Sequence, residues 1–180
     1  MSEHPNPRER RGFTLMEIAI TLALAAIVIA LVGSLFVASL TAWRRGQEVR
    51  EAQVQAAALA DLMARDVRNA SQAPSVTIRP RFAVDAGEPI LSIAAAATAA
   101  PGDASAWILY LFLPDRGEVL RQVVTAAPGG RVTPHQSRVV ATGVAKITAD
   151  QVASGVTIEV EVRRGRATAR TRVTAAPRNP

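Results

Sequence analysis

The sequence predicts an α+β protein in which a long N-terminal helix, transmembrane in its first half, packs on a mainly antiparallel β-sheet head. Three observations predict this fold class. No charged residue interrupts the apolar stretch from Ile18 to Trp43. The apolar residues then recur with a helical period as far as Ala70. From Ser75 onward the period changes to two, with turn residues at intervals, which is typical of strands.

The apolar stretch is long enough to cross a membrane, because a bilayer core needs about 20 apolar residues in a helix. Arginines flank it on both sides, so charge gives weak guidance on orientation. We expect the short N-terminal flank to stay in the cytoplasm and the residues after Trp43 to lie outside. A secretory signal peptide is a poor alternative, since its apolar core has about 7–15 residues. A plain signal anchor would explain the length but not Glu17, an acid at the start of the span.

The residues around Glu17 form a recognisable motif, Arg11-Gly12-Phe13-Thr14-Leu15-Met16-Glu17-Ile18. A basic leader ends in glycine, phenylalanine follows, and a glutamate occupies the fifth position after the glycine. This pattern resembles the cleavage and methylation motif of type IV prepilins and type II secretion pseudopilins. The resemblance implies that residues 1–12 are a leader, cut between Gly12 and Phe13 by a membrane-embedded prepilin peptidase that also N-methylates Phe13.

The same resemblance implies a role for Glu17 in subunit assembly. Cleavage would give Phe13 a positive amine, and the fifth-position carboxylate would neutralise that amine on a neighbouring subunit or on its own chain. Such a charge pair is much stronger at low dielectric than in water. The competing interpretation is that Glu17 lies in the first turn of the helix, where the helix dipole favours an acid.

Residues 44–73 are predicted to continue the helix in amphipathic form, after residues 13–43 in the membrane. One apolar stripe carries residues at helical spacing: Leu59, Leu62, Met63, Val67 and Ala70. The segment from Asn69 to Pro74 is the predicted end of the helix. Residues 74–180 are then the β-rich head, which we expect in the periplasm, with a single-pass anchor in the inner membrane.

The alternation of apolar and polar residues predicts seven strands in the head: Val76–Val84, Ile90–Ala95, Trp107–Leu113, Val119–Thr125, Arg138–Thr148, Val156–Arg163 and Ala167–Ala175. Trp107–Leu113 is apolar on both faces, which predicts a central strand covered on both sides. The turn at residues 114–117 joins it to the next strand in a hairpin. Residues 94–106 and 126–136 are predicted loops, and His135 is expected to be exposed in the second loop.

The last two strands form the clearest predicted hairpin. A two-residue turn at Arg164-Gly165 would place Glu159 opposite Arg170 and Val160 opposite Ala169. Acidic residues would then face arginines on the solvated side of the hairpin. Most charges in this region therefore need no functional explanation.

Composition argues against catalysis and against cofactors. The chain has no cysteine, which excludes disulfides, cysteine-ligated zinc and thiol chemistry. His4 and His135 are the two histidines, too few for a multi-histidine metal site. The aspartates at 103, 115 and 150 are isolated, so no calcium cluster is expected. We therefore expect no enzyme activity, no cofactor and no metal.

The net charge of +6 and the pI near 11.3 permit binding to nucleic acid or acidic lipid. The arginines are scattered, however, and no dense basic patch carries interleaved aromatic residues. Nucleic acid is therefore not an expected partner, whereas inner-membrane lipid is.

Two further stretches resemble J-type minor pseudopilins. The first is Leu59–Ala70 at the end of the long helix. The second is the aromatic-containing strand Trp107–Leu113 with its turn and the following Glu118–Arg121. This resemblance implies a place at the tip of the type II secretion pseudopilus, with prepilin peptidase, I-type and K-type subunits and other pseudopilins as partners. W-type minor type IV pilins share the helix-end stretch. A minor pilin for adhesion, motility or DNA uptake is thus the alternative, and a membrane-anchored ligand-binding domain is a more distant one.

Overall fold

The computed structural model describes residues 13–70, 76–78, 87–94, 105–126, 132–153 and 155–177. One long helix, α1, runs from Leu15–Arg68. The chain divides into two compact units, the first ending at Arg44 and the second beginning at Arg45. The predicted leader, residues 1–12, lies outside the described residues.

In the first unit, the described residues form the apolar part of α1 and the two residues before it. Its large apolar side chains are exposed from Phe13 to Trp43. By length and composition α1 can cross a membrane, and none of its most apolar window is buried. A signal sequence near an N-terminus passes the same test. The hydroxyls of Thr21, Ser34 and Thr41 donate to backbone oxygens one turn back, at 2.7, 2.8 and 2.8 Å. These polar groups are therefore satisfied within the helix, as an apolar environment requires.

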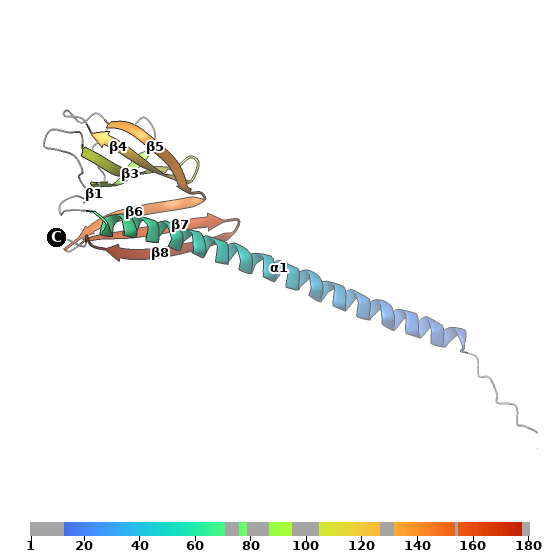
Figure 1. The fold of residues 1–180 in the computed structure, drawn as a ribbon. Helices are drawn as coiled ribbons and strands as arrows, with labels where there is room; N and C mark the ends of the chain where they lie inside the picture. The colour runs from blue at the N-terminus through green and yellow to red at the C-terminus, as the bar shows by residue number, and fades with distance from the viewer. Residues whose placement is uncertain are drawn as a thin grey trace, which may run out of the picture. The chain divides into compact units, whose positions relative to one another are not determined.

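The second unit contains the rest of α1 and two antiparallel sheets (Figure 1). The five-stranded sheet has the order β1-β2-β3-β4-β5 and the three-stranded sheet has the order β6-β7-β8. The strands are β1 Val76–Ile78, β2 Glu88–Ala94, β3 Ser105–Leu113, β4 Glu118–Ala126, β5 Val132–Ala141, β6 Val144–Val152, β7 Gly155–Arg164 and β8 Ala167–Ala175. The predicted α+β class, with a long helix on antiparallel sheets, is confirmed.

The core of the second unit lies between α1 and both sheets. The buried face of α1 is rich in alanine, with Leu59, Met63 and Val67 as its large members. Small side chains let the helix backbone approach the sheets closely, and the large ones fill the remaining space. Both sheets contribute buried residues to this core, among them Ile93 of β2 and Ile158 of β7. Leu62, predicted for the stripe, is only half-buried.

The predicted central strand is confirmed as β3, the third of five strands in its sheet. Its consecutive residues Leu109, Tyr110, Leu111 and Phe112 are all buried. Since successive side chains of a strand point to opposite faces, both faces of β3 are covered. The predicted hairpin also forms, with Leu113 paired to Glu118 across the turn.

The strand predicted at Arg138–Thr148 is wrong, because two strands of different sheets occupy this stretch. β5 ends at Ala141 and β6 begins at Val144. Between them Gly143 has a φ of 70°, a left-handed conformation that glycine adopts without steric cost. The carbonyl oxygen of Gly143 accepts a hydrogen bond from the Arg163 amide at 2.8 Å. The chain thus leaves the first sheet and enters the second at this glycine.

The loop predicted at residues 126–136 is also corrected, because β5 already begins at Val132. Pro134 suggested a loop, but β5 is the last strand of its sheet and pairs only with β4. Proline is tolerated on such an edge strand, and the pairing register shifts beside it, between Val123 and Val124. His135 is exposed, as expected, but it lies in this strand and shares a 2.8 Å hydrogen bond with Thr125.

The register predicted for the last hairpin is wrong by two residues. Glu159 pairs with Arg172 and Val160 with Thr171, because the turn is Gly165-Arg166. Gly165 has a φ of 54° and takes the first turn position, which suits tight hairpins. A two-residue slip leaves each side chain on its face, so Glu159 still faces arginines and forms ion pairs with both Arg170 and Arg172.

Candidate functional site

The N-terminal end of α1 is held by a reciprocal pair of contacts between Thr14 and Glu17. The Thr14 amide donates to Glu17 Oε2 at 3.0 Å, and the Glu17 amide donates to Thr14 Oγ1 at 3.3 Å. The Thr14 hydroxyl also donates to Glu17 Oε2 at 3.1 Å. This is a capping box, in which the residue before the helix and the third helical residue satisfy each other's free amides. The motif thus also specifies where the helix begins.

The other predicted site residues are placed only in part. Phe13 is exposed, at 84% of its full accessible surface, directly before the capping box. Gly12, the residue on the other side of the predicted cleavage point, lies outside the described residues. The roles of Gly12 and Phe13 in cleavage, of Phe13 in methylation and of Glu17 in assembly remain predictions. What the geometry adds is that Glu17 has a structural partner within its own chain.

A second polar site lies in the head, where Asp66 of α1 meets Tyr110 of β3 and Arg121 of β4. The Tyr110 hydroxyl donates to Asp66 Oδ2 at 2.6 Å, and Arg121 Nε donates to the same oxygen at 2.8 Å. The Asp66 side chain is 12% exposed and that of Arg121 is 27% exposed. One carboxylate oxygen therefore ties the helix to two neighbouring strands through charge-assisted hydrogen bonds.

Two residues of this cluster, Tyr110 and Arg121, have raised pKa values. Burial raises the pKa of Tyr110 far above its ordinary value, and the hydrogen bond to Asp66 raises it further. The hydrogen bond to Asp66 also raises the pKa of Arg121. Both shifts favour a neutral phenol and a charged guanidinium around the Asp66 carboxylate. The arrangement stabilises structure and offers no nucleophile paired with a base.

Alkaline pH is expected to destabilise the head through Tyr110. The unfolded chain loses its phenolic proton above pH of about 10, whereas the folded chain retains it. Stability from this group is therefore complete below pH 10 and falls above it by about 1.4 kcal/mol per pH unit. Tyr110→Phe should remove this slope when unfolding is measured as a function of pH. The chain contains one tyrosine, so tyrosinate absorbance reports this group alone, and its appearance at pH 10 in folded protein would contradict the expectation.

The sequence contains one signal for this cluster. Tyr110 interrupts an apolar strand with a hydroxyl that needs a partner when buried. The four-residue turn after Leu113 places Tyr110 directly opposite Arg121. Asp66 lies on α1 beside the stripe residues Met63 and Val67, and its approach to β3 depends on how the helix packs. The strand pairing could be predicted from the turn, but the contact with the helix could not.

The β7–β8 turn forms another attachment to α1 within the second unit. The Arg166 amide donates to Glu48 Oε2 at 3.4 Å, and Arg164 Nε donates to Gln55 Oε1 at 3.1 Å. A side chain on Gly165 would meet the Glu48 carboxylate at 2.8 Å. Glu48 therefore supports the hairpin. Among the described parts of the chain, no group of three histidine, aspartate or glutamate residues could hold a metal ion.

Comparison with known protein families identifies the N-terminal segment. Residues 7–33 match the family described as the prokaryotic N-terminal methylation motif. The match includes Gly12, Phe13 and Glu17 and extends well into the apolar part of α1. Comparison with curated proteins and with solved structures gave no significant match. The chain therefore carries a prepilin-type N-terminus ahead of a long helix and a β-sheet head, which supports a subunit of the type IV pilin or pseudopilin kind.

Proposed function

We propose that the chain is a minor pseudopilin, processed by prepilin peptidase and assembled into a type II secretion pseudopilus at its tip. The match of residues 7–33 to the methylation motif carries the proposal. Its continuation into an exposed apolar helix and a β-sheet head supports a membrane-anchored subunit. The protein is then a substrate of the peptidase and a structural element, with no enzymatic activity of its own.

The proposed placement has the leader in the cytoplasm, one span in the inner membrane and the head in the periplasm. In this arrangement, the peptidase cuts between Gly12 and Phe13, and Glu17 pairs with the amine of Phe13 on a neighbouring subunit. The J-type assignment, with I-type and K-type partners, rests on Leu59–Ala70 and on the hairpin formed by Trp107–Leu113 and Glu118–Arg121. These two stretches meet through the ion pair between Asp66 and Arg121, which supports treating them as one structural feature.

Processing is tested by the N-terminal residue and mass of the protein from cells with and without prepilin peptidase. We expect a chain that begins at N-methylated Phe13 with the peptidase, and a chain that retains residues 1–12 without it. Gly12→Val should block cleavage, because a branched side chain obstructs access to the backbone. Gly33→Ala is the matched control, since nothing lies within 4 Å of a side chain added there. A chain that begins near Trp43 in both strains would reveal an ordinary signal peptide and overturn the proposal.

The kind of filament is tested by deletion of the gene in its own host. A pseudopilin deletion should stop protein export across the outer membrane and leave pili unchanged. Loss of pili or DNA uptake with normal export would instead establish a minor type IV pilin. Re-expression of the Gly33→Ala variant should restore whichever activity was lost, and that of Gly12→Val should not.

A further inference from the structure

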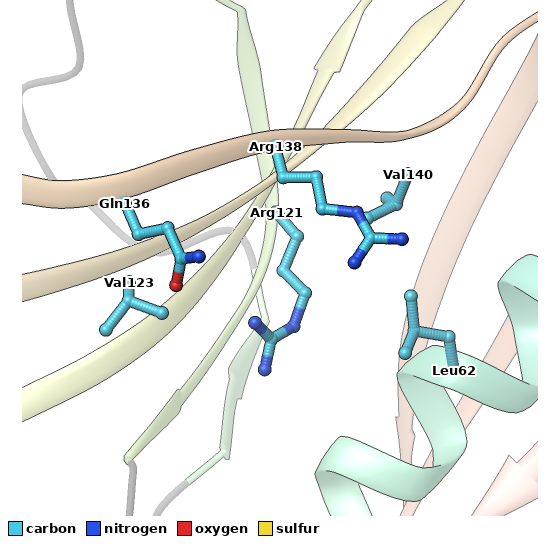
Figure 2. A pocket seen from close by; sticks show the side chains of 6 residues that line it. All are labelled: Leu62, Arg121, Val123, Gln136, Arg138 and Val140. Carbon is cyan, nitrogen blue, oxygen red and sulfur yellow. The ribbon is translucent and has the colours of Figure 1, made fainter.

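A small cavity at the side of the head carries two arginines on its wall. It has a volume of about 150 Å³ and is lined by residues of α1, β4 and β5, namely Leu62, Arg121, Val123, Gln136, Arg138 and Val140. Figure 2 shows both guanidinium groups on the same side of the sheet, with Leu62 across from them. We refer to these six residues as the arginine pocket. Pockets for drug-sized ligands have roughly 300–1,000 Å³, so this one has room for a single side chain.

The charge in the arginine pocket is unbalanced. Arg121 and Arg138 are direct partners in the pairing of β4 with β5, and like charges at such positions destabilise a sheet. Arg121 is neutralised by Asp66, at 2.8 Å. Among the described residues, Arg138 has no acidic partner within salt-bridge distance, and it is exposed. One of the two arginines is therefore paired with a carboxylate and the other is not, which leaves a net positive charge over an apolar wall.

The pocket is also the place where the helix-facing side of the five-stranded sheet becomes accessible. Tyr110, Phe112 and Val119 on this face belong to the core together with α1. Farther along the same face, Val123 and Val140 are half-buried, and Gln136 and Arg138 are exposed. A side chain from outside would meet aliphatic surface for its methylene groups and a guanidinium for its end.

We propose that the arginine pocket receives a glutamate or aspartate side chain of a neighbouring pilin-like subunit, with Arg138 as its principal ion-pair partner. The inference rests on the proposed function for the existence of such a neighbour. A second carboxylate balances the second arginine and relieves the repulsion across β4 and β5. Arg138 then gains in the filament the ion pair that it lacks with the described residues of its own chain.

The test uses the full chain in its host, with the photo-crosslinking residue p-benzoylphenylalanine introduced at Gln136. We expect a crosslink to another pilin-like subunit, at a peptide that contains Asp or Glu. Arg138→Gln should lower the crosslink yield about tenfold, the effect of losing one charge-assisted hydrogen bond. Arg163→Gln, at an exposed position in the other sheet, is the matched control and should leave the yield unchanged. Replacing the partner's acid by arginine should restore crosslinking to an Arg138→Glu chain.

Folding and processing are measured on the same samples. The melting temperature of purified Arg138→Gln in detergent should be equal to or slightly above that of the original chain, which separates a binding role from a folding role. If the chain is not processed as a pseudopilin, the same mass spectra will contain the uncleaved N-terminal peptide. That result would contradict the proposed function. The inference would be overturned by any of three results in a chain that is cleaved normally. The crosslink from position 136 could be absent, the crosslinked peptide could contain no acidic residue, or Arg138→Gln could leave the crosslink yield unchanged.

Discussion

Replacing Asp66 with asparagine is expected to lower the stability of the head by about 2–3 kcal/mol. The change removes the charge that pairs with Arg121 and weakens the acceptor for the Tyr110 hydroxyl. Breaking a fully buried ion pair costs about 3–5 kcal/mol. The cost here is lower because the Arg121 side chain is 27% exposed and can turn toward water. For a domain of this size the change corresponds to a melting temperature lower by about 7–10 °C.

The measurement is thermal unfolding of the full chain in detergent, followed by a signal of tertiary structure. Asp61→Asn is the matched control, because Asp61 is exposed on the same helix and should change stability by less than about 0.5 kcal/mol. Combining Asp66→Asn with Arg121→Gln should cost clearly less than the sum of the two single changes, since each removes the same contact. Additive effects would show that the ion pair does not couple α1 to β4.

The same cluster shows how far the sequence predicts this fold. An uninterrupted apolar stretch and a helical stripe are local properties, so they predict α1 almost to its ends. Alternation and a four-residue turn predict the pairing of Tyr110 with Arg121 across the hairpin. The position of Asp66 above that pair depends on helix–sheet packing, which no local pattern contains. Local patterns therefore give the elements and adjacent pairings, whereas contacts between elements require the structure.

The errors in the head have the same origin. Residues 138–148 contain no proline that would divide them, and only the left-handed conformation of Gly143 shows that the chain changes sheets there. Pro134 suggests a loop until β5 is known to be an edge strand. In the last hairpin, the choice between Arg164-Gly165 and Gly165-Arg166 as the turn shifts the register without exposing any core residue. The alternation of polar and apolar residues is satisfied by both turns, so it cannot choose between them.

Substitution of Glu17 is expected to separate the capping of its own helix from the proposed neutralisation of the amine of a neighbouring subunit. Glu17→Ala removes both the cap and the charge. Glu17→Gln keeps an oxygen that can accept from the Thr14 amide but removes the charge. Thr14→Ala keeps the charge and removes the hydroxyl half of the capping box. All three variants should insert and be cleaved, because the leader and the apolar helix are unchanged.

The readout is the amount of subunit in sheared filaments relative to cleaved subunit in the membrane. If the charge drives assembly, Glu17→Gln and Glu17→Ala should both reduce incorporation about tenfold or more, and Thr14→Ala should have a small effect. Two unit charges 4 Å apart interact by about 1 kcal/mol in water but about 4 kcal/mol at an effective dielectric constant of 20. A lost cap costs only about 0.5–2 kcal/mol, and only within the helix itself.

The capping box is compatible with a charge pair to a neighbouring subunit because it uses only one oxygen of Glu17. The Thr14 amide and hydroxyl both donate to Oε2, so Oε1 can accept from an incoming amine without loss of the cap. The cap would then hold the carboxylate at a fixed position at the start of the helix, beside the amine that cleavage creates on Phe13. Normal incorporation of Glu17→Gln, together with impaired incorporation of Thr14→Ala, would assign Glu17 to capping alone and remove it from the assembly site.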